Sequence, residues 1–202
     1  MKKALVVIIL SVIVLSIVIF TRSAKVPITN SGPIVALGAS LFEGVGATPG
    51  NDLPQQISER LGKPVLNLGV SGNTSADGLA RINQVPVDAS IVILSLGGND
   101  ILKRVPATET EANLKKLINQ FTKNGSVVVL LDVRGPIGSG EYRDVYQSVA
   151  ESNSNVVLVP NVLRGILTNT NLMSDLIHPN DAGYAIMADR ISEAILTNTN
   201  LN

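Results

Sequence analysis

Five short apolar runs constrain the fold of this chain more than any other feature. They are continuously apolar rather than alternating, which is typical of strands that helices cover on both faces. The runs lie at residues 33–37, 64–68, 91–96, 126–131 and 155–159. Longer amphipathic segments alternate with them and predict helices at residues 52–61, 74–83, 108–123, 141–152, 161–167 and 180–196.

This alternation predicts an α/β fold with three αβα layers. Connections between parallel strands are right-handed, which places helices on both faces of the sheet. We therefore expect a flavodoxin-like five-stranded parallel sheet with the strand order 2-1-3-4-5. One domain, at residues 33–202, accounts for the chain once the N-terminus is set aside.

The N-terminal residues 1–25 predict a membrane segment. Lys2 and Lys3 precede an apolar run at residues 4–20, which as a helix would span about 26 Å. The run is longer than the apolar region of most signal peptides, and Arg22 stands where a cleavage site needs a small residue. We favour an uncleaved anchor in a bacterial cell envelope over a cleaved signal that leaves the domain secreted or periplasmic. The lysines then place the domain outside, and residues 26–32 are interpreted as a linker that does not belong to the fold.

The charge balance argues against nucleic acid as a partner. The chain has 16 basic and 16 acidic residues, and four of the basic ones but no acidic one lie in the first 32 positions. The rest of the chain therefore carries 12 basic and 16 acidic groups, a net charge of −4. No basic stripe offsets this balance. The chain has no cysteine, which excludes disulfides, thiolate chemistry and cysteine metal sites, and we expect no metal or other cofactor.

The chain contains one histidine, His178, within Asp175-Leu176-Ile177-His178-Pro179. Without cysteine, a general base at neutral pH must be this residue. Asp175 lies three positions earlier, close enough to hold the imidazole in one tautomer. The alternative is a surface histidine that caps the helix opened by Pro179.

Glycine-bearing polar turns follow the first three predicted strands. They contain Ser40 after Gly38-Ala39, Gly72 within residues 69–75, and Asn99 after Gly97-Gly98. Ligands of open α/β sheets bind outside the carboxyl ends of the strands, so these turns should meet the loop of Asp175 and His178 at one edge. Each turn alone is most often a tight turn or a helix cap. Their convergence with an Asp–His pair favours a catalytic site.

These blocks, in this order and spacing, resemble the SGNH (GDSL-type) hydrolases, and more narrowly the bacterial thioesterase I, arylesterase and lysophospholipase group. The resemblance spans residues 33–196. It implies Ser40 as the nucleophile, His178 as the base and Asp175 as the residue that orients the base. It implies an oxyanion hole made by the backbone N–H groups of Ser40 and Gly72 and the side-chain amide of Asn99.

The resemblance implies a serine esterase or thioesterase that acts on a small acyl ester or thioester as a monomer without a cofactor. The family usually has Asp between the glycine and the nucleophilic serine, where this chain has Ala39. That Asp helps to hold the nucleophile turn, so its loss concerns the rigidity of the turn. The α/β-hydrolase fold is set aside because G-x-S-x-G is missing around Ser40.

Two alternatives remain open from the residues. One keeps the triad but removes O-acetyl groups from a cell-envelope polysaccharide, and the other is an anchored binding protein with a degenerate site. Residues 134–142, after the fourth predicted strand, could be a mobile lid or a plain loop. Residues 44–50 lack a P-loop lysine and are interpreted as a flexible segment beside the nucleophile.

Overall fold

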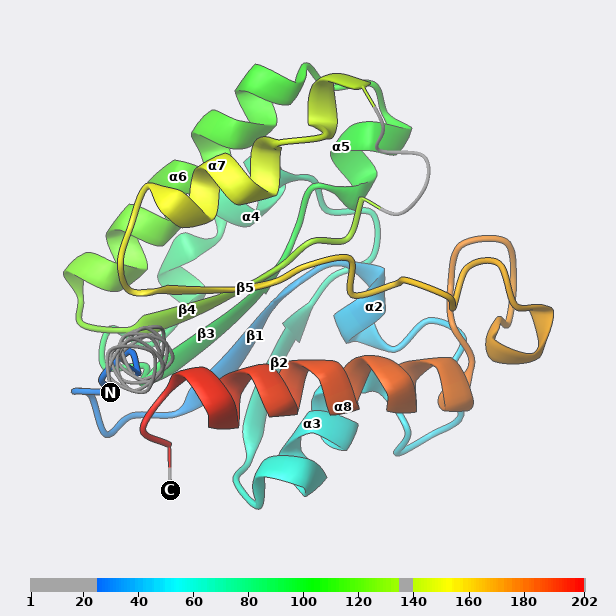
Figure 1. Cartoon of the computed structure of the whole chain (residues 1–202), viewed down its shortest axis with the longest axis horizontal. Coiled ribbons are helices and arrows are strands. Elements are labelled where there is room, and N and C mark those ends of the chain that lie inside the picture. The colour runs from blue at the N-terminus through cyan, green and yellow to red at the C-terminus, as the bar shows by residue number, and fades with distance from the viewer. Residues whose placement is uncertain (1–24, 135–139, 202) are drawn as a thin grey trace, which may run out of the picture.

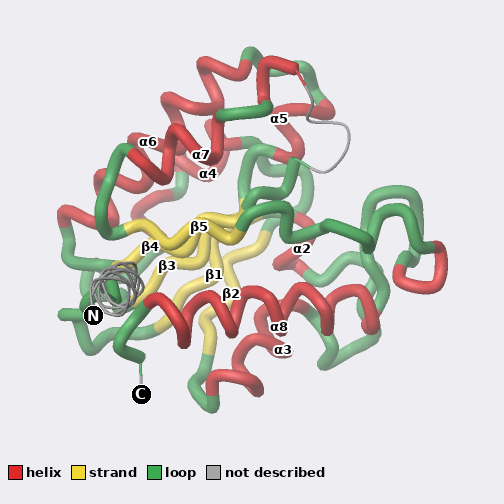
Figure 2. The backbone as a smooth tube through the Cα atoms, viewed as in Figure 1, coloured by secondary structure: helices red, strands yellow, loops and turns green. Residues whose placement is uncertain are grey.

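A parallel five-stranded sheet lies at the centre of the structure (Figure 2). The structure is a computed structural model, which describes residues 25–134 and 140–201. The strands are β1 (Ile34–Gly38), β2 (Val65–Gly69), β3 (Ile91–Ser95), β4 (Val127–Leu131) and β5 (Val156–Val159). They pair in the order β2-β1-β3-β4-β5, and every pairing is parallel. The order 2-1-3-4-5 predicted from the sequence is confirmed.

Helices cover both faces of this sheet and complete the three predicted layers. The α-helices are α2 (Ser40–Glu43), α3 (Leu53–Leu61), α4 (Ser75–Ala80), α5 (Gly98–Leu102), α6 (Ala107–Lys123), α7 (Val145–Glu151) and α8 (Asp181–Asn198). The 3-10 helices of the described residues are η1 (Ile82–Gln84), η3 (Gly140–Tyr142) and η4 (Thr170–Leu172). α3 and α8 pack against each other on one face, while α4, α6 and α7 lie on the other (Figure 1).

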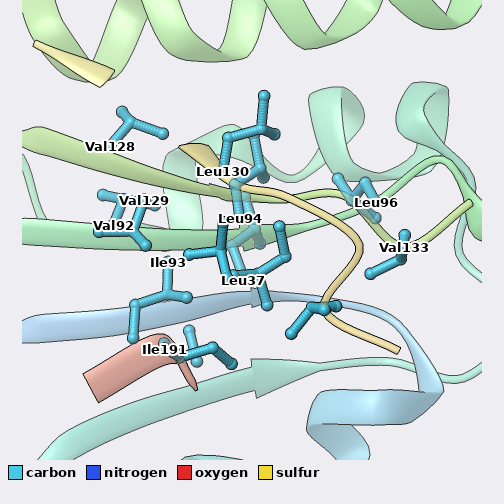
Figure 3. Close-up of a cluster of buried hydrophobic side chains, with 14 of the residues drawn as sticks. Leu37, Val92, Ile93, Leu94, Leu96, Val128, Val129, Leu130, Val133 and Ile191 are labelled. Carbon is cyan, nitrogen blue, oxygen red and sulfur yellow. The ribbon is translucent and has the colours of Figure 1, made fainter. Parts of the chain in front are cut away.

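The core between these layers is aliphatic. β1, β3 and β4 are buried along their whole length. Figure 3 shows Leu37, Ile93 and Leu130 from these three strands in one cluster, together with Ile191 of α8. Burying each such side chain contributes about 1.5–3 kcal/mol, so the central strands set a rigid platform for the turns at their ends.

The expectation that helices cover every strand on both faces is wrong for β2. This strand forms one edge of the sheet, and Leu66 within it is 42% exposed. Asn67 in the same strand donates its side-chain amide to the Phe42 carbonyl at 2.7 Å. The edge position therefore tolerates partial exposure and provides a polar tie to α2.

Most predicted helices are present, with shifted boundaries. α3 begins after Asp52, whose side chain accepts from the N–H of Gln55, and ends at Gly62 in the left-handed conformation. The helix predicted at residues 141–152 is shorter, because α7 begins only at Val145. The short helices α2 and α5 were not predicted.

The helix predicted at residues 161–167 is wrong. This segment is a series of turns, in which the N–H of Arg164 donates to the Asn161 carbonyl at 2.8 Å and that of Ile166 to the Leu163 carbonyl at 3.0 Å. Asn161 and Gly165 have φ angles of 45° and 73°. Positive φ at two positions prevents a regular right-handed helix.

Residues 26–32, expected to be a linker outside the fold, are bound to the domain. The N–H of Val26 donates to the Asn198 carbonyl at 2.7 Å. The Asn30 side chain donates to the carbonyls of Ala89 and Asn124 at 3.1 and 2.9 Å. The predicted anchor at residues 1–25 lies outside the described residues apart from Lys25. Within the part of the chain that the structure describes, no helix combines the length and apolarity needed to cross a membrane.

Candidate active site

The carboxyl ends of three neighbouring strands lie at the same level. Gly38 at the end of β1 is paired with Gly69 of β2 and with Ser95 of β3. A side chain at Gly69 would collide with the backbone N of Glu43, and one at Gly38 would lie 2.7 Å from the Ser95 carbonyl oxygen. These contacts bring the turns that follow the strands close together, as the sequence predicted.

Ser40 is the first residue of α2, directly after the strand-to-helix turn. The N–H groups of Phe42 and Glu43 donate to the Ala39 carbonyl at 3.1 and 3.0 Å, and close the first turn of the helix. The backbone N–H of a residue at this position has no acceptor within its own helix. Among the described residues none is recorded for the Ser40 N–H, so this donor is available to a ligand.

Asp175 and His178 form the predicted pair. Asp175 Oδ2 lies 2.7 Å from His178 Nδ1, while Asp175 Oδ1 accepts the backbone N–H groups of Ile177 and His178 at 2.8 and 2.7 Å. The His178 ring and the Ile177 N–H lower the pKa of Asp175 to about 2. An ionised Asp175 holds the proton on Nδ1 and leaves Nε2 as the basic nitrogen. The His178 side chain is 14% exposed, against 50% for Asp175.

The loop that carries this pair is tied at both ends. The N–H of Ser174 donates to the His178 carbonyl at 2.9 Å, and the N–H of Asn180 donates to the Leu172 carbonyl at 2.9 Å. Asn180, not His178, caps α8, because its side chain accepts from the N–H groups of Ala182 and Gly183. The alternative in which His178 serves as a helix cap is therefore wrong.

Gly72 adopts a φ of 79° in the loop between β2 and α4. A side chain there would have open space around it, so the backbone conformation, and not crowding within the protein, favours glycine. The loop is linked to the turn that carries Ser40, since the N–H of Val70 donates to the Gly38 carbonyl at 3.2 Å and the N–H of Ser71 to the Glu43 carboxylate. In the described part of the chain no acceptor is recorded for the Gly72 N–H.

Asn99 lies on α5, beside the same loop. Its side-chain Nδ2 donates to the Asn73 carbonyl at 2.9 Å. An amide nitrogen has two hydrogens, so this bond orients the group and leaves the second hydrogen for another acceptor.

A cavity of about 290 Å³ lies beside these groups. Its volume is just below the 300–1,000 Å³ typical of ligand pockets. Ser40, Asn99 and His178 line the cavity. Gly72 does not line it, but its neighbour Asn73 does. Most of the remaining wall is apolar: Ala39, Leu41, Leu96, Ile101, Leu102, Val133, Leu163, Leu167, Leu176 and Ile177. Between the described side chains of Ser40 and His178 no hydrogen bond is recorded, and such bonds are often long before substrate binds.

Asp100 was predicted only as part of the Asn99 turn, yet it organises this part of the site. It is fully buried. Its carboxylate accepts the N–H and hydroxyl of Ser75 at 2.8 and 2.5 Å and the Thr110 hydroxyl at 3.1 Å. It therefore joins α4, α5 and α6 next to Asn99. A single Asp after Asn carries no sequence signal for this role.

Residues 44–50 follow α2, which carries Ser40, and contact the loop that carries His178. Tyr184 donates its hydroxyl to the Val45 carbonyl at 2.7 Å, and Thr48 binds Asp181 through both its N–H and its hydroxyl. This segment is thus tied to α8, whereas the sequence suggested a flexible one. The candidate lid at residues 134–142 lies partly outside the described residues, although Arg134 lines the cavity. Across residues 25–134 and 140–201, no cluster of three His, Cys, Asp or Glu side chains could hold a metal ion.

Comparison with known proteins agrees with this arrangement. The GDSL-like lipase/acylhydrolase family matches residues 36–186. An arylesterase of Vibrio mimicus is 27% identical over 179 residues, which cover 82% of this chain and 89% of the relative. The thioesterase 1/protease 1/lysophospholipase L1 of Escherichia coli K12 is 25% identical over 171 residues, 80% of this chain and 82% of the relative.

A solved structure supports the same assignment. The crystal structure of TesA superimposes with a TM-score of 0.75 and 26% identity, and the match covers 81% of this chain and 98% of that one. The chain therefore belongs to the GDSL-like lipase/acylhydrolase family and is an ester hydrolase of the SGNH type.

Proposed function

We propose that this protein hydrolyses short acyl esters or thioesters with Ser40 as the nucleophile, His178 as the base and Asp175 as the orienting carboxylate. One observation carries the proposal: His178, whose ring is bonded to Asp175, lines the same cavity as Ser40.

In the proposed mechanism, His178 Nε2 takes the hydroxyl proton of Ser40 as Oγ attacks the acyl carbonyl carbon. The tetrahedral intermediate collapses when the C–O or C–S bond to the leaving group breaks and His178 returns the proton to that group. Water then attacks the acyl-enzyme by the same route and releases the carboxylic acid. Asp175 stays ionised throughout and stabilises the imidazolium.

The oxyanion of the intermediate would be held by the Ser40 N–H, the Gly72 N–H and the Asn99 amide. The first two have no recorded acceptor in the described part of the chain, and the third is oriented by Asn73. Each donor contributes about 3–4 kcal/mol to the stability of such an intermediate, which corresponds to about 100- to 1,000-fold in rate.

The lining of the cavity supports an acyl group as the part of the substrate that is recognised. Leu41, Ile101 and Leu163 are among the apolar side chains that face it beside Ser40. An aliphatic chain loses water-exposed surface against such a wall. The names of the arylesterase and thioesterase relatives agree with ester and thioester substrates.

We propose that the domain lies on the extracytoplasmic face of a membrane that holds residues 1–25. The geometry of the domain then determines which way the cavity faces. Val26 is bonded to Asn198 at one end of α8, and His178 precedes the other end of that helix. Eighteen helical residues span about 27 Å. The chain thus enters the domain at the end opposite the active site (Figure 1). The cavity would therefore face away from the membrane and towards soluble substrates. We propose that the protein acts as a monomer.

The direct test compares Ser40→Ala with Ser58→Ala, a serine on α3 away from the cavity. Hydrolysis of p-nitrophenyl acetate and butyrate should disappear in the first variant and persist in the second, while both keep the circular dichroism spectrum of the parent. Hydrolysis by Ser40→Ala at the parent rate would refute the proposal.

A further inference from the structure

The carbonyl oxygen of Gly38, two residues before the nucleophile, accepts two hydrogen bonds. One comes from the N–H of Val70 at 3.2 Å. The other comes from the side chain of Arg81, whose Nη2 lies 2.7 Å away. A guanidinium is thus directed at a main-chain carbonyl of the turn that presents Ser40.

Arg81 reaches this carbonyl because α4 is held rigidly. Thr74 and Asp77 form a reciprocal capping box at the start of the helix, and Arg81 occupies its end. A side chain at Gly78 would collide with Leu96, so α4 packs closely beside β3. The end of α4 therefore places the Arg81 side chain across the end of the sheet, within hydrogen-bond distance of β1.

The surroundings of Arg81 show that this contact is its main polar interaction. Its Nη1 donates to the Gln84 side chain at 3.2 Å. Its Nε is buried with no hydrogen-bond partner in the described part of the chain. None of the ion pairs recorded among the described residues involves Arg81. Burial lowers the pKa of Arg81, and the Asp77 carboxylate opposes this effect without forming an ion pair. Burying part of a cation is unfavourable, and the short contact with the Gly38 carbonyl is the hydrogen bond that the structure gains from it.

We propose that Arg81 is a positioning residue that holds the nucleophile turn and the Gly72 loop in mutual register. The inference rests on the proposed roles of Ser40 and Gly72. The Gly38 carbonyl belongs to the same peptide group as the Ala39 N–H. The N–H of Val70, on the same oxygen, lies two residues before Gly72. The Arg81 guanidinium therefore binds the Gly38 carbonyl, which also connects the nucleophile turn to the loop that carries Gly72.

The presence of Ala39 makes the hydrogen bond between Arg81 and the Gly38 carbonyl more important. Its methyl side chain cannot form a hydrogen bond, so it cannot hold the turn in the way that the family's usual Asp does. Around the Gly38 carbonyl, Arg81 is the one side chain of the described residues that is recorded as a donor. Arg81 thus supplies a side-chain hydrogen bond to a turn in which residue 39 can form none.

The test compares Arg81→Met and Arg81→Lys with Arg60→Met. Arg60 is a control because it also donates to main-chain carbonyls, those of Gln56 and Ala185, but on the opposite face of the sheet. We measure kcat and KM for p-nitrophenyl butyrate, the rate of inactivation by a fluorophosphonate, and the melting temperature. A displacement of about 1 Å at a reacting group can cost about 100-fold in rate.

Arg81→Met should lower kcat and the inactivation rate by about 10- to 100-fold with little change in KM. Arg81→Lys, which keeps one cationic donor, should recover part of the loss. Arg60→Met should retain the kcat of the parent even if its melting temperature falls as far. An Arg81→Met variant that folds with parental kcat and inactivation rate, or a loss in that variant confined to KM, would overturn the inference.

The outcome separates this inference from the proposed function. If Ser40→Ala remains active, the assignment of the nucleophile fails whatever Arg81 does. If Ser40→Ala is inactive but the Arg81 variants react with the fluorophosphonate as fast as the parent, only the role of Arg81 fails.

Discussion

Asp175 binds His178 at two points, since one carboxylate oxygen lies 2.7 Å from the ring Nδ1 and the other accepts the backbone N–H of the same residue at 2.7 Å. The carboxylate thus holds both the imidazole and the main chain that carries it. A side chain that is half exposed can orient the base because the loop, and not burial, restricts its motion.

Replacing Asp175 by Asn should therefore reduce kcat by about 10,000-fold by analogy with other Ser-His-Asp triads. An amide can present its NH₂ group to Nδ1 and favour the tautomer with the proton on the wrong nitrogen. Asp181→Asn is the matched control, because that exposed carboxylate binds Thr48 instead, and it should keep most of the activity. A loss below about tenfold in Asp175→Asn would show that another group orients His178.

The same pair predicts how stability depends on pH. Folding lowers the pKa of Asp175 from 3.8 to about 2, so between these values the unfolded chain binds more protons than the folded one. The stabilisation is complete above about pH 4 and is lost as the pH falls towards 2. The difference in melting temperature between the parent and Asp175→Asn should accordingly shrink across this range. A difference that stays constant would mean that the carboxylate is not stabilised by folding.

Gly46 should be needed to seat the histidine loop. It has a φ of 92°, and a side chain there would collide with Ser174 Oγ and lie 2.5 Å from the Pro179 carbonyl oxygen. Gly50 has a φ of 84° but open space around it, so Gly50→Ala isolates the backbone strain. Gly50→Ala should lose about 1 kcal/mol of stability from the strain alone, and Gly46→Ala should lose more because of the added collisions. Only Gly46→Ala should also lower kcat, by about tenfold or more, because the loop is displaced. Equal kcat values in the two variants would argue against this contact.

Asp100→Ala should destabilise the domain by about 3 kcal/mol, because it leaves the Ser75 and Thr110 donors without their buried acceptor. For a domain of this size the melting temperature should fall by about 6–12 °C. Asp144→Ala, at an exposed position before α7, should change it little. Similar melting temperatures for the two variants would show that the buried network contributes nothing to stability.

The sheet could be predicted from the sequence because the buried strands β1, β3 and β4 form nearly continuous apolar runs, in which Ser95 at the end of β3 is the one polar residue. Their order and the convergence of Ser40, Asn99 and His178 then follow from general rules of parallel sheets. The turns at residues 161–167 could not be predicted, because the left-handed conformation of Asn161 is not favoured strongly enough by its residue type to be read from sequence.

The contacts of Arg81 and Asp100 near the site also could not be predicted from the sequence. Arg81 and Asp100 act through contacts with segments distant along the chain, at Gly38 and at Ser75 and Thr110. No local periodicity or motif encodes such contacts. Likewise, the docking of residues 26–32 depends on carbonyls from two separate loops, at Ala89 and at Asn124, and on the end of α8, which only the folded structure brings together.

The central claim is that Ser40 is the nucleophile, and mapping the site of fluorophosphonate labelling tests it most directly. The full chain is assayed with p-nitrophenyl butyrate, labelled, digested and analysed by mass spectrometry, with Ser40→Ala in parallel. The account predicts one adduct, on the peptide that contains Ser40, and none in Ser40→Ala. An adduct on another serine, or full hydrolytic activity with Ser40 unlabelled, would contradict it.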